Sequence, residues 1–189
     1  MKSFEEIYEK VKNTLSEKRF YHSVCVMNRA IEYAKIYGED EEKAKLAGLV
    51  HDIAKEVPKE KRVENAEKLG VNLDNIEKTN TGLIHAKAGA KIAETEFGLD
   101  KEICDAIAYH TTGKENMTTL QKIIYLADFT GIDRKFDDLD YLYKLCKEDL
   151  DKAMLYSLRK TILEKVDEEK IMHLDTVKAY NYYLKNSWV

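Results

Sequence analysis

The chain is 189 residues long, and its 31 lysines and arginines against 35 aspartates and glutamates give a formal net charge of −4. The single proline, Pro58, excludes collagen-like and proline-rich disordered chains. The small negative charge argues against binding nucleic acid through bulk electrostatics, so we expect no nucleic-acid partner. The length suits one domain with a sizeable core, and we expect residues 1–189 to form it.

The cysteines indicate a reducing compartment. Cys25, Cys104 and Cys146 are odd in number and far apart, with no Cys-x-x-Cys pair, so we expect free, buried thiols. The charged segment 1–10 lacks the apolar stretch of a signal peptide. No segment approaches the roughly 18 apolar residues of a membrane span. We therefore expect a cytoplasmic protein without a membrane partner.

Apolar residues recur at helical spacing along almost the whole chain. In chain order, the spacing predicts helical segments at about 4–15, 24–38, 46–57, 59–69, 83–96, 100–110, 117–129, 138–146, 148–166 and 175–186. Gly38 and Gly70 are natural helix ends, and Pro58 stops the segment before it. Residues 71–80 are predicted to be a loop or a short helix. No alternating strand pattern is evident, so we expect an all-α protein of about nine or ten helices.

Six histidine and aspartate side chains stand out, because each lies in or at the end of a predicted helix with apolar neighbours. They are His22, His51, Asp52, His85, His110 and Asp128. Carboxylates and neutral imidazoles on converging helices are ligands that suit Fe, Mn, Zn or Ni. Taken singly, each residue has an ordinary alternative, such as a core histidine or a buried hydrogen-bond acceptor. The whole ordered set, rather than any one member, predicts a metal site.

The order His, His-Asp, His, His, Asp resembles the HD superfamily of metal-dependent phosphohydrolases. The surrounding sequence is similar to one bacterial family within it, the symmetrical bis(5′-nucleosyl)-tetraphosphatases. The matching words are RFYHS at 19–23, AGLVHDIAK at 47–55, IHAKAGA at 84–90, AIAYHTTG at 106–113, KIIYLAD at 122–128 and HLDTV at 173–177. They cover nearly the whole chain, with a motif core at about 19–135.

The resemblance implies a single HD-domain helical bundle that holds two divalent or mixed-valence metal ions. By that resemblance the first metal has the ligands His22, His51, Asp52 and Asp128, and the second has Asp52, His85 and His110. Asp52 suits the bridging position, since each of its oxygens can face one cation. The resemblance favours iron, with Mn, Co, Ni or Mg as alternatives. The implied reaction is cleavage of diadenosine tetraphosphate to two ADP by metal-activated water.

Asp52 and Lys55 are the predicted catalytic residues. Lys55 follows Asp52 by three positions, so on one helix the two share a face and the ammonium can reach a phosphate. The predicted substrate-binding residues are Arg19, Lys55, Thr111, Thr112, Gly113 and Arg134. The ordinary alternatives are a surface charge for Arg19 and Lys55, and a helix cap for the Thr-Thr-Gly segment.

This chain departs from the family pattern at two places. The family usually carries an acidic residue and a proline between the Asp128 word and an arginine, where this chain has Gly131 and Ile132. It also usually has a proline after the residue that matches His173, where this chain has Leu174. The first departure concerns the rim of the pocket and not the metal ligands. His173 lies outside the ligand set, and we expect it to make a structural hydrogen bond near the C-terminal helix.

Two other functions remain open at this point. The same core would serve an HD phosphohydrolase that acts on (p)ppGpp or on a deoxynucleotide, although the chain lacks the long regulatory domain of the large alarmone enzymes. The second alternative is a non-catalytic HD module that binds a nucleotide or a protein. Such a module would be expected to have lost some of the metal ligands, and none of the six is missing. The resemblance also suggests a homodimer, for which no interface stripe is evident.

Overall fold

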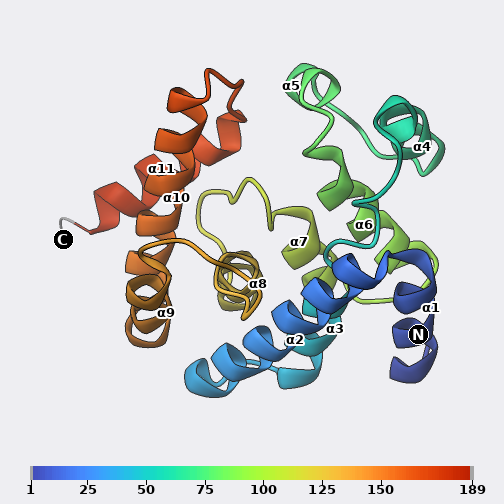
Figure 1. Cartoon of the computed structure of the whole chain (residues 1–189), viewed down its shortest axis with the longest axis horizontal. Helices are drawn as coiled ribbons and strands as arrows, with labels where there is room; N and C mark the ends of the chain where they lie inside the picture. The colour runs from blue at the N-terminus through green and yellow to red at the C-terminus, as the bar shows by residue number, and fades with distance from the viewer. Residues whose placement is uncertain (1, 188–189) are drawn as a thin grey trace.

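Within residues 2–187, the part of the chain that this computed structural model describes, the backbone is helical and has no β-strand (Figure 1). The helices are α1 (Phe4–Thr14), α2 (Glu17–Tyr37), α3 (Glu41–Val50), η1 (Lys59–Lys61), α4 (Arg62–Lys68), α5 (Asn75–Thr79), α6 (Ile84–Thr95), α7 (Lys101–Ala108), α8 (Thr119–Phe129), α9 (Leu139–Glu148), α10 (Leu150–Asp167) and α11 (Leu174–Asn186). The all-α prediction is confirmed.

The described residues form eleven α-helices, slightly more than expected, because the segment 71–80 contains a short helix. Helix α5 is held by a capping box, in which the Asp74 side chain accepts from the Glu77 backbone and the Glu77 side chain accepts from the Asp74 backbone. Such reciprocal caps satisfy backbone donors that a short helix cannot pair internally.

Helix α3 ends at Val50, so the prediction of a helix that continues through His51 and Asp52 toward Pro58 is wrong. The ring of His51 donates through Nδ1 to the carbonyl of Gly48 at 2.7 Å. A continuing helix would offer that carbonyl to the backbone N–H of Asp52. The chain instead forms tight turns, with Lys55 N donating to Asp52 O at 2.9 Å, and these turns keep Lys55 beside Asp52.

The long helix α2 packs against α3 and α8, and α8 in turn packs against α7 and α10 (Figure 1). Helices α9, α10 and α11 lie on one side of α8, while α4, α5 and α6 lie on the other side of the view. One cluster of buried apolar side chains runs through this assembly from Ile7 in α1 to Tyr183 in α11. The central helices therefore have little freedom to move apart.

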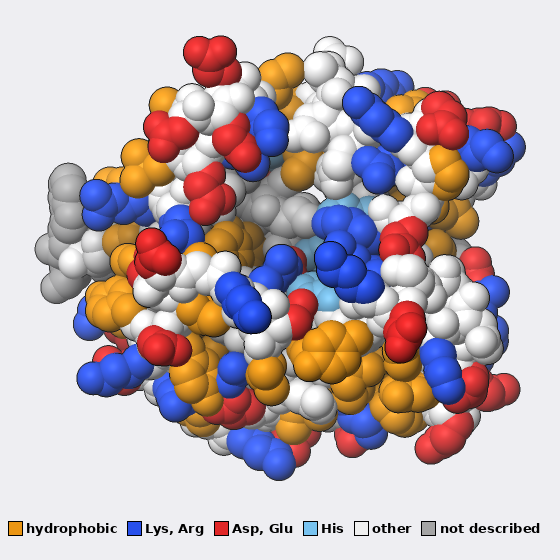
Figure 2. All heavy atoms as spheres, in the orientation of Figure 1, with side chains coloured by type: hydrophobic (Ala, Val, Ile, Leu, Met, Phe, Trp, Pro, Cys, Tyr) orange, Lys and Arg blue, Asp and Glu red, His pale blue; other side chains and the backbone are white. Residues whose placement is uncertain are grey.

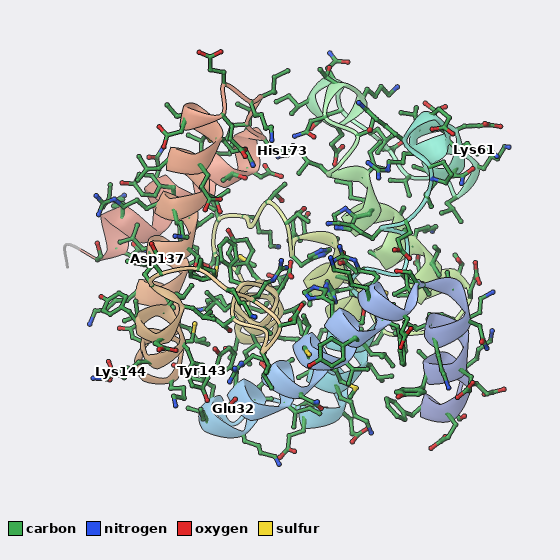
Figure 3. All side chains as sticks on the ribbon, viewed as in Figure 1. Glu32, Lys61, Asp137, Tyr143, Lys144 and His173 are labelled. Carbon is green, nitrogen blue, oxygen red and sulfur yellow. The ribbon has the colours of Figure 1, made fainter. Side chains whose placement is uncertain are left out.

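His173 bridges distant parts of the chain (Figure 3). Its Nδ1 accepts from the backbone N–H of Asp175 at the start of α11, and its Nε2 bonds the Asp74 carboxylate at 2.9 Å. The contact joins the beginning of α11 to the beginning of α5. The prediction of a structural hydrogen bond for His173 is confirmed.

The three cysteines are free thiols, as predicted, although Cys104 is only half-buried. Across residues 2–187, none of the helices combines the length and the apolar character that crossing a membrane requires.

Close approach of α2 and α3 makes Gly48 a sensitive position. A Cβ there would lie 2.8 Å from Met27 Cα, a backbone atom that cannot turn away. Alanine gains about 1 kcal/mol in helix propensity, but overpacking against a backbone costs about 1–3 kcal/mol. We expect Gly48→Ala to lower the free energy of unfolding by up to about 2 kcal/mol, measured by urea denaturation. Glu41→Ala on the exposed side of α3 is the control, and equal stability of the two variants would contradict the close packing.

Candidate metal centre

The six predicted ligands come together at one place, although they come from five segments of the chain. His22 lies in α2, His51 and Asp52 follow α3, His85 lies in the first turn of α6, His110 follows α7, and Asp128 lies in α8. The four imidazoles and Asp52 are buried, and Asp128 is half-buried. In Figure 2 the histidines are visible at the bottom of a hollow that is rimmed by lysine and arginine side chains.

The two oxygens of Asp52 face different pairs of imidazoles. Oδ2 lies 3.5 Å from His51 Nε2 and 3.8 Å from His22 Nε2. Oδ1 lies 3.1 Å from His85 Nε2 and 3.6 Å from His110 Nε2. This division matches the bridging position that the family resemblance implies for Asp52.

Asp128 faces the first of these pairs. Its Oδ1 lies 3.1 Å from His22 Nε2 and 4.0 Å from His51 Nε2. The ligand atoms of His22, His51 and Asp128 lie within 4.8 Å of one another, and so do those of His51, Asp52 and His110. Each group offers three nitrogen or oxygen donors, a set that suits a borderline or hard divalent metal.

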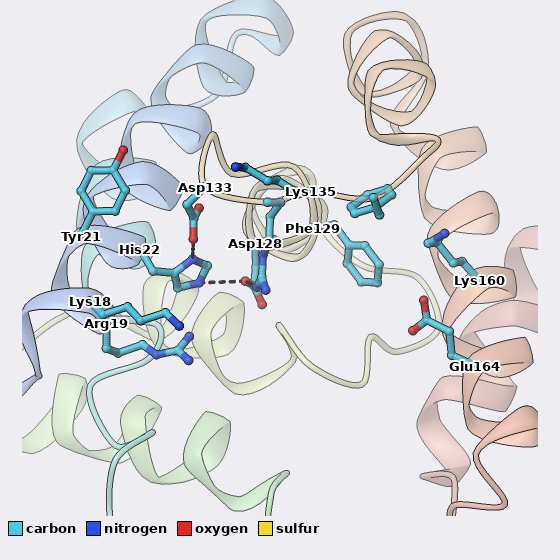
Figure 4. Close-up of a pocket in the computed structure, with 12 residues that line it drawn as sticks. Lys18, Arg19, Tyr21, His22, Asp128, Phe129, Asp133, Lys135, Lys160 and Glu164 are labelled. Atoms are coloured by element: carbon cyan, nitrogen blue, oxygen red, sulfur yellow. Dashed lines mark hydrogen bonds and ion pairs between the residues drawn. The ribbon is translucent and has the colours of Figure 1, made fainter.

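The Nδ1 atom of each ring, on the side away from the centre, makes a hydrogen bond that fixes the orientation of the ring. His51, His85 and His110 each place Nδ1 2.7 Å from the backbone carbonyl three residues earlier. A carbonyl can only accept, so each Nδ1 carries the proton and each Nε2 keeps its lone pair. His22 differs, because its Nδ1 lies 2.7 Å from Oδ2 of Asp133 (Figure 4).

Several buried polar atoms in this centre lack a hydrogen-bond partner. They are His22 Nε2, His51 Nε2 and Asp52 Oδ1. A buried polar group without a partner costs about 1–3 kcal/mol, and a cluster of such groups needs an explanation. Cations coordinated by these atoms would supply it, so the residues present fit the metals that the HD resemblance implies.

The pKa shifts favour the protonation states that metal ligands need. Burial alone would raise the pKa of Asp52, but its interactions with the surrounding histidines, His51 foremost, outweigh burial and hold the pKa far below its usual value. Burial likewise opposes ionisation of Asp128, and the contact with His22 and the Arg134 charge lower its pKa. Burial lowers the pKa of His85 to about 4. Both acids are therefore ionised and His85 is neutral near pH 7.

Three cations lie beside the carboxylates. Arg19 Nη1 is 2.9 Å from Asp52 Oδ2, and Lys55 Nζ is 3.7 Å from Asp52 Oδ1. Arg134 donates through Nε to the backbone carbonyl of Asp128 at 2.7 Å and pairs with its carboxylate. Arg19 and Arg134 also line a cavity of about 850 Å³ that opens onto His22 and Asp128 (Figure 4).

The Thr-Thr-Gly segment after His110 is arranged differently from its predicted role. The Thr112 hydroxyl donates to Gly113 O, and the Thr112 carbonyl accepts from Thr176. Gly113 is buried, with Leu158 as the nearest side chain to the position of its absent Cβ. Their polar groups thus serve the packing of α10 and α11, and only the Thr111 hydroxyl is buried without a partner.

The sequence interpretation missed Asp133, which contacts His22 directly. The residue lies in the stretch where the chain departs from the family pattern, one position before Arg134. The sequence signal for Asp133 was its position, two residues after Gly131, where the family usually carries an acidic residue.

Comparison with known proteins agrees with this geometry. A family model described as "HD domain" matches residues 19–130, which contain all six predicted ligands. The chain belongs to the HD domain family. It is 39% identical over 97% of its length to a Bacillus subtilis protein named symmetrical bis(5′-nucleosyl)-tetraphosphatase, covering 98% of that protein. A Halalkalibacterium halodurans protein of the same name is 39% identical, with 92% of this chain and 93% of that protein covered.

A crystal structure shares the fold of this HD-family chain along its whole length. It is described as a predicted HD superfamily hydrolase involved in NAD metabolism from Clostridium acetobutylicum. The two superpose with a TM-score of 0.94 at 42% sequence identity, covering 98% of this chain and 99% of the other.

Metal binding should stabilise the chain through Asp52. A ligand at 100 times its Kd adds about 2.7 kcal/mol to the free energy of unfolding, or about 5–10 °C in Tm for a chain of this size. We expect Mn²⁺ to raise Tm by this order in the wild type and to have little effect on Asp52→Ala, measured by differential scanning calorimetry. The exposed Asp137→Ala is the control and should respond like the wild type. An equal Mn²⁺ response in Asp52→Ala would contradict the proposed bridging role.

Proposed function

We propose that this chain hydrolyses diadenosine tetraphosphate symmetrically to two ADP, using two metal ions held by the six histidine and aspartate ligands. The observation that carries the proposal is the division of the Asp52 oxygens between two pairs of imidazoles. The full-length similarity to two proteins named symmetrical bis(5′-nucleosyl)-tetraphosphatase supports the substrate. When bound, the metals would supply charge neutralisation on phosphoryl oxygens and a water of lowered pKa.

The chain's own residues would then bind and orient the polyphosphate. Lys55 lies 3.0 Å from His85 Nε2, so its ammonium is close enough to neutralise charge on a phosphate held there. Arg19 and Arg134, which line the cavity beside the centre, can each present a planar guanidinium to a phosphate. We include Thr111 through its unpartnered hydroxyl, whereas the surroundings of Thr112 and Gly113 give no support for phosphate contact.

The cavity beside the metal centre suits a nucleotide. Its walls combine Arg19 and Arg134 with the rings of Phe129 and Phe136, and Lys160 of α10 lies at its far side (Figure 4). Apolar rings beside a few cations are the composition that a base with several phosphates requires. A volume of about 850 Å³ lies within the usual range for ligand sites.

Four further parts of the proposal concern the working state of the protein. We propose iron as the resident metal, supported by the all nitrogen and oxygen ligand set, which Mn, Co, Ni or Mg would also satisfy. The free thiols support a cytoplasmic location. The continuous core from α1 to α11 supports one HD domain over the whole chain, and a homodimer rests on the family resemblance alone.

Product analysis tests the function directly. We expect purified protein with Mn²⁺, Fe²⁺ or Co²⁺ to convert diadenosine tetraphosphate into ADP as the sole nucleotide product, measured by HPLC. A mixture of AMP and ATP would indicate asymmetric cleavage and contradict the proposal. Faster turnover of (p)ppGpp or a deoxynucleoside triphosphate on the same metals would replace the proposed substrate, and no turnover with any metal would contradict catalysis altogether.

Lys55 should act on the reaction more than on stability. Loss of one charged group that stabilises developing charge typically costs about 100–1,000-fold in kcat. We expect Lys55→Ala to lower kcat by that order with Tm changed by less than about 3 °C. Lys59→Ala removes an exposed lysine at the start of η1, and this matched control should keep wild-type kcat. Equal kcat in the two variants would exclude Lys55 from the reaction.

A further inference from the structure

The Nδ1 atom of His22 is hydrogen-bonded to a side chain, whereas Nδ1 of each of the other three imidazoles of the centre is hydrogen-bonded to a backbone carbonyl. We propose that Asp133 is a positioning residue that fixes the tautomer of His22, and that Gly131 provides the space its carboxylate needs. The proposal rests on the metal site proposed above and is independent of the substrate.

The contact between Asp133 and His22 is short and sheltered. Asp133 Oδ2 lies 2.7 Å from His22 Nδ1, and the His22 side chain is only 5% exposed. On the opposite edge of the ring, His22 Nε2 faces Asp128 Oδ1 at 3.1 Å (Figure 4). A carboxylate accepts the proton of Nδ1, which leaves the lone pair on Nε2, the nitrogen that faces the centre.

Asp133 makes few other polar contacts that could explain its placement. Its second oxygen, Oδ1, is buried and has no hydrogen-bond partner. A buried acceptor without a partner lowers the stability of the fold. The hydrogen bond to His22 is therefore the favourable interaction that accounts for the position of this carboxylate. A carboxylate behind a ligand imidazole also makes the imidazole more basic, which a backbone carbonyl does less strongly.

Gly131 leaves free the space that the Asp133 carboxylate occupies. A Cβ at position 131 would lie 2.7 Å from Asp133 Oδ1, and the next nearest atom, Ala127 O, is 3.6 Å away. The backbone gives no reason for glycine, because Gly131 is not among the residues with a positive φ. Any side chain at 131 therefore displaces mainly the Asp133 carboxylate. The Asp133 carboxylate thus occupies the space that a side chain at position 131 would take.

Imidazole NMR on the full-length chain tests the tautomer without turnover. In ¹⁵N-histidine protein without added metal, we expect the wild-type His22 to carry its proton on Nδ1. Asp133→Ala should shift the population toward the Nε2–H form, which is the more common tautomer of a free imidazole. Gly131→Ala should act in the same direction, since its new Cβ displaces the carboxylate while leaving Asp133 present. Asp137→Ala, an exposed acid in the same segment, should keep the wild-type spectrum.

Affinity for Mn²⁺ is the second readout, measured by competition with a chelator. Outer contacts of this kind typically contribute 10–100-fold to metal affinity, so we expect a loss of that order in Asp133→Ala and a smaller loss in Gly131→Ala. Wild-type tautomer and wild-type affinity in both variants would overturn the proposal. Neither readout involves the substrate, so a wild-type chain that fails to cleave diadenosine tetraphosphate would count against the proposed function and leave this inference standing.

Discussion

The buried carboxylate of Asp52 is the constraint on which the rest of the site depends. A carboxylate this deep in a helical core is costly unless positive or donating groups surround it on every side. Here the cations Arg19 and Lys55 lie beside its two oxygens. The Nε2 atoms of four histidines also face these oxygens, and a bound cation would attract both sets of acceptors. The Asp52 carboxylate also remains ionised near neutral pH, because its surroundings lower the pKa further than burial raises it. The same surroundings that make the buried charge tolerable therefore create a centre that can hold cations.

The fold serves this centre through its rigid core. The six predicted ligands come from five helices or helix ends, and each of these helices packs directly on at least one of the others. Small residues permit the approach, as Gly48 does where α3 meets α2. The end of α3 shows how closely scaffold and site are linked. The ring of His51 takes the Gly48 carbonyl, the helix stops, and the resulting turn holds Asp52 and Lys55 at the centre.

Sequence singled out the six side chains that the structure brings together, because histidine and aspartate in apolar helices are rare and expensive to bury, so their order carries information. The ends of helices were less predictable. Helical spacing continues past His51, whereas the helix ends where the His51 ring bonds the Gly48 carbonyl and the backbone turns more tightly. Asp133 escaped notice because its partner is 111 positions away in sequence, a distance that no local pattern reports. Thr112 and Gly113 belong to the Thr-Thr-Gly segment for which the sequence predicts substrate binding. Their surroundings, however, are formed by α10 and α11, which come much later in the chain.

The central claim is that Asp52 divides its oxygens between two cations. Anomalous diffraction from crystals grown with Mn²⁺ tests it most directly. We expect two anomalous peaks in each chain. One should lie in contact with Asp52 Oδ2 and the ligands His22, His51 and Asp128, and the other with Asp52 Oδ1, His85 and His110. A single peak, or two peaks that Asp52 does not touch, would contradict the account.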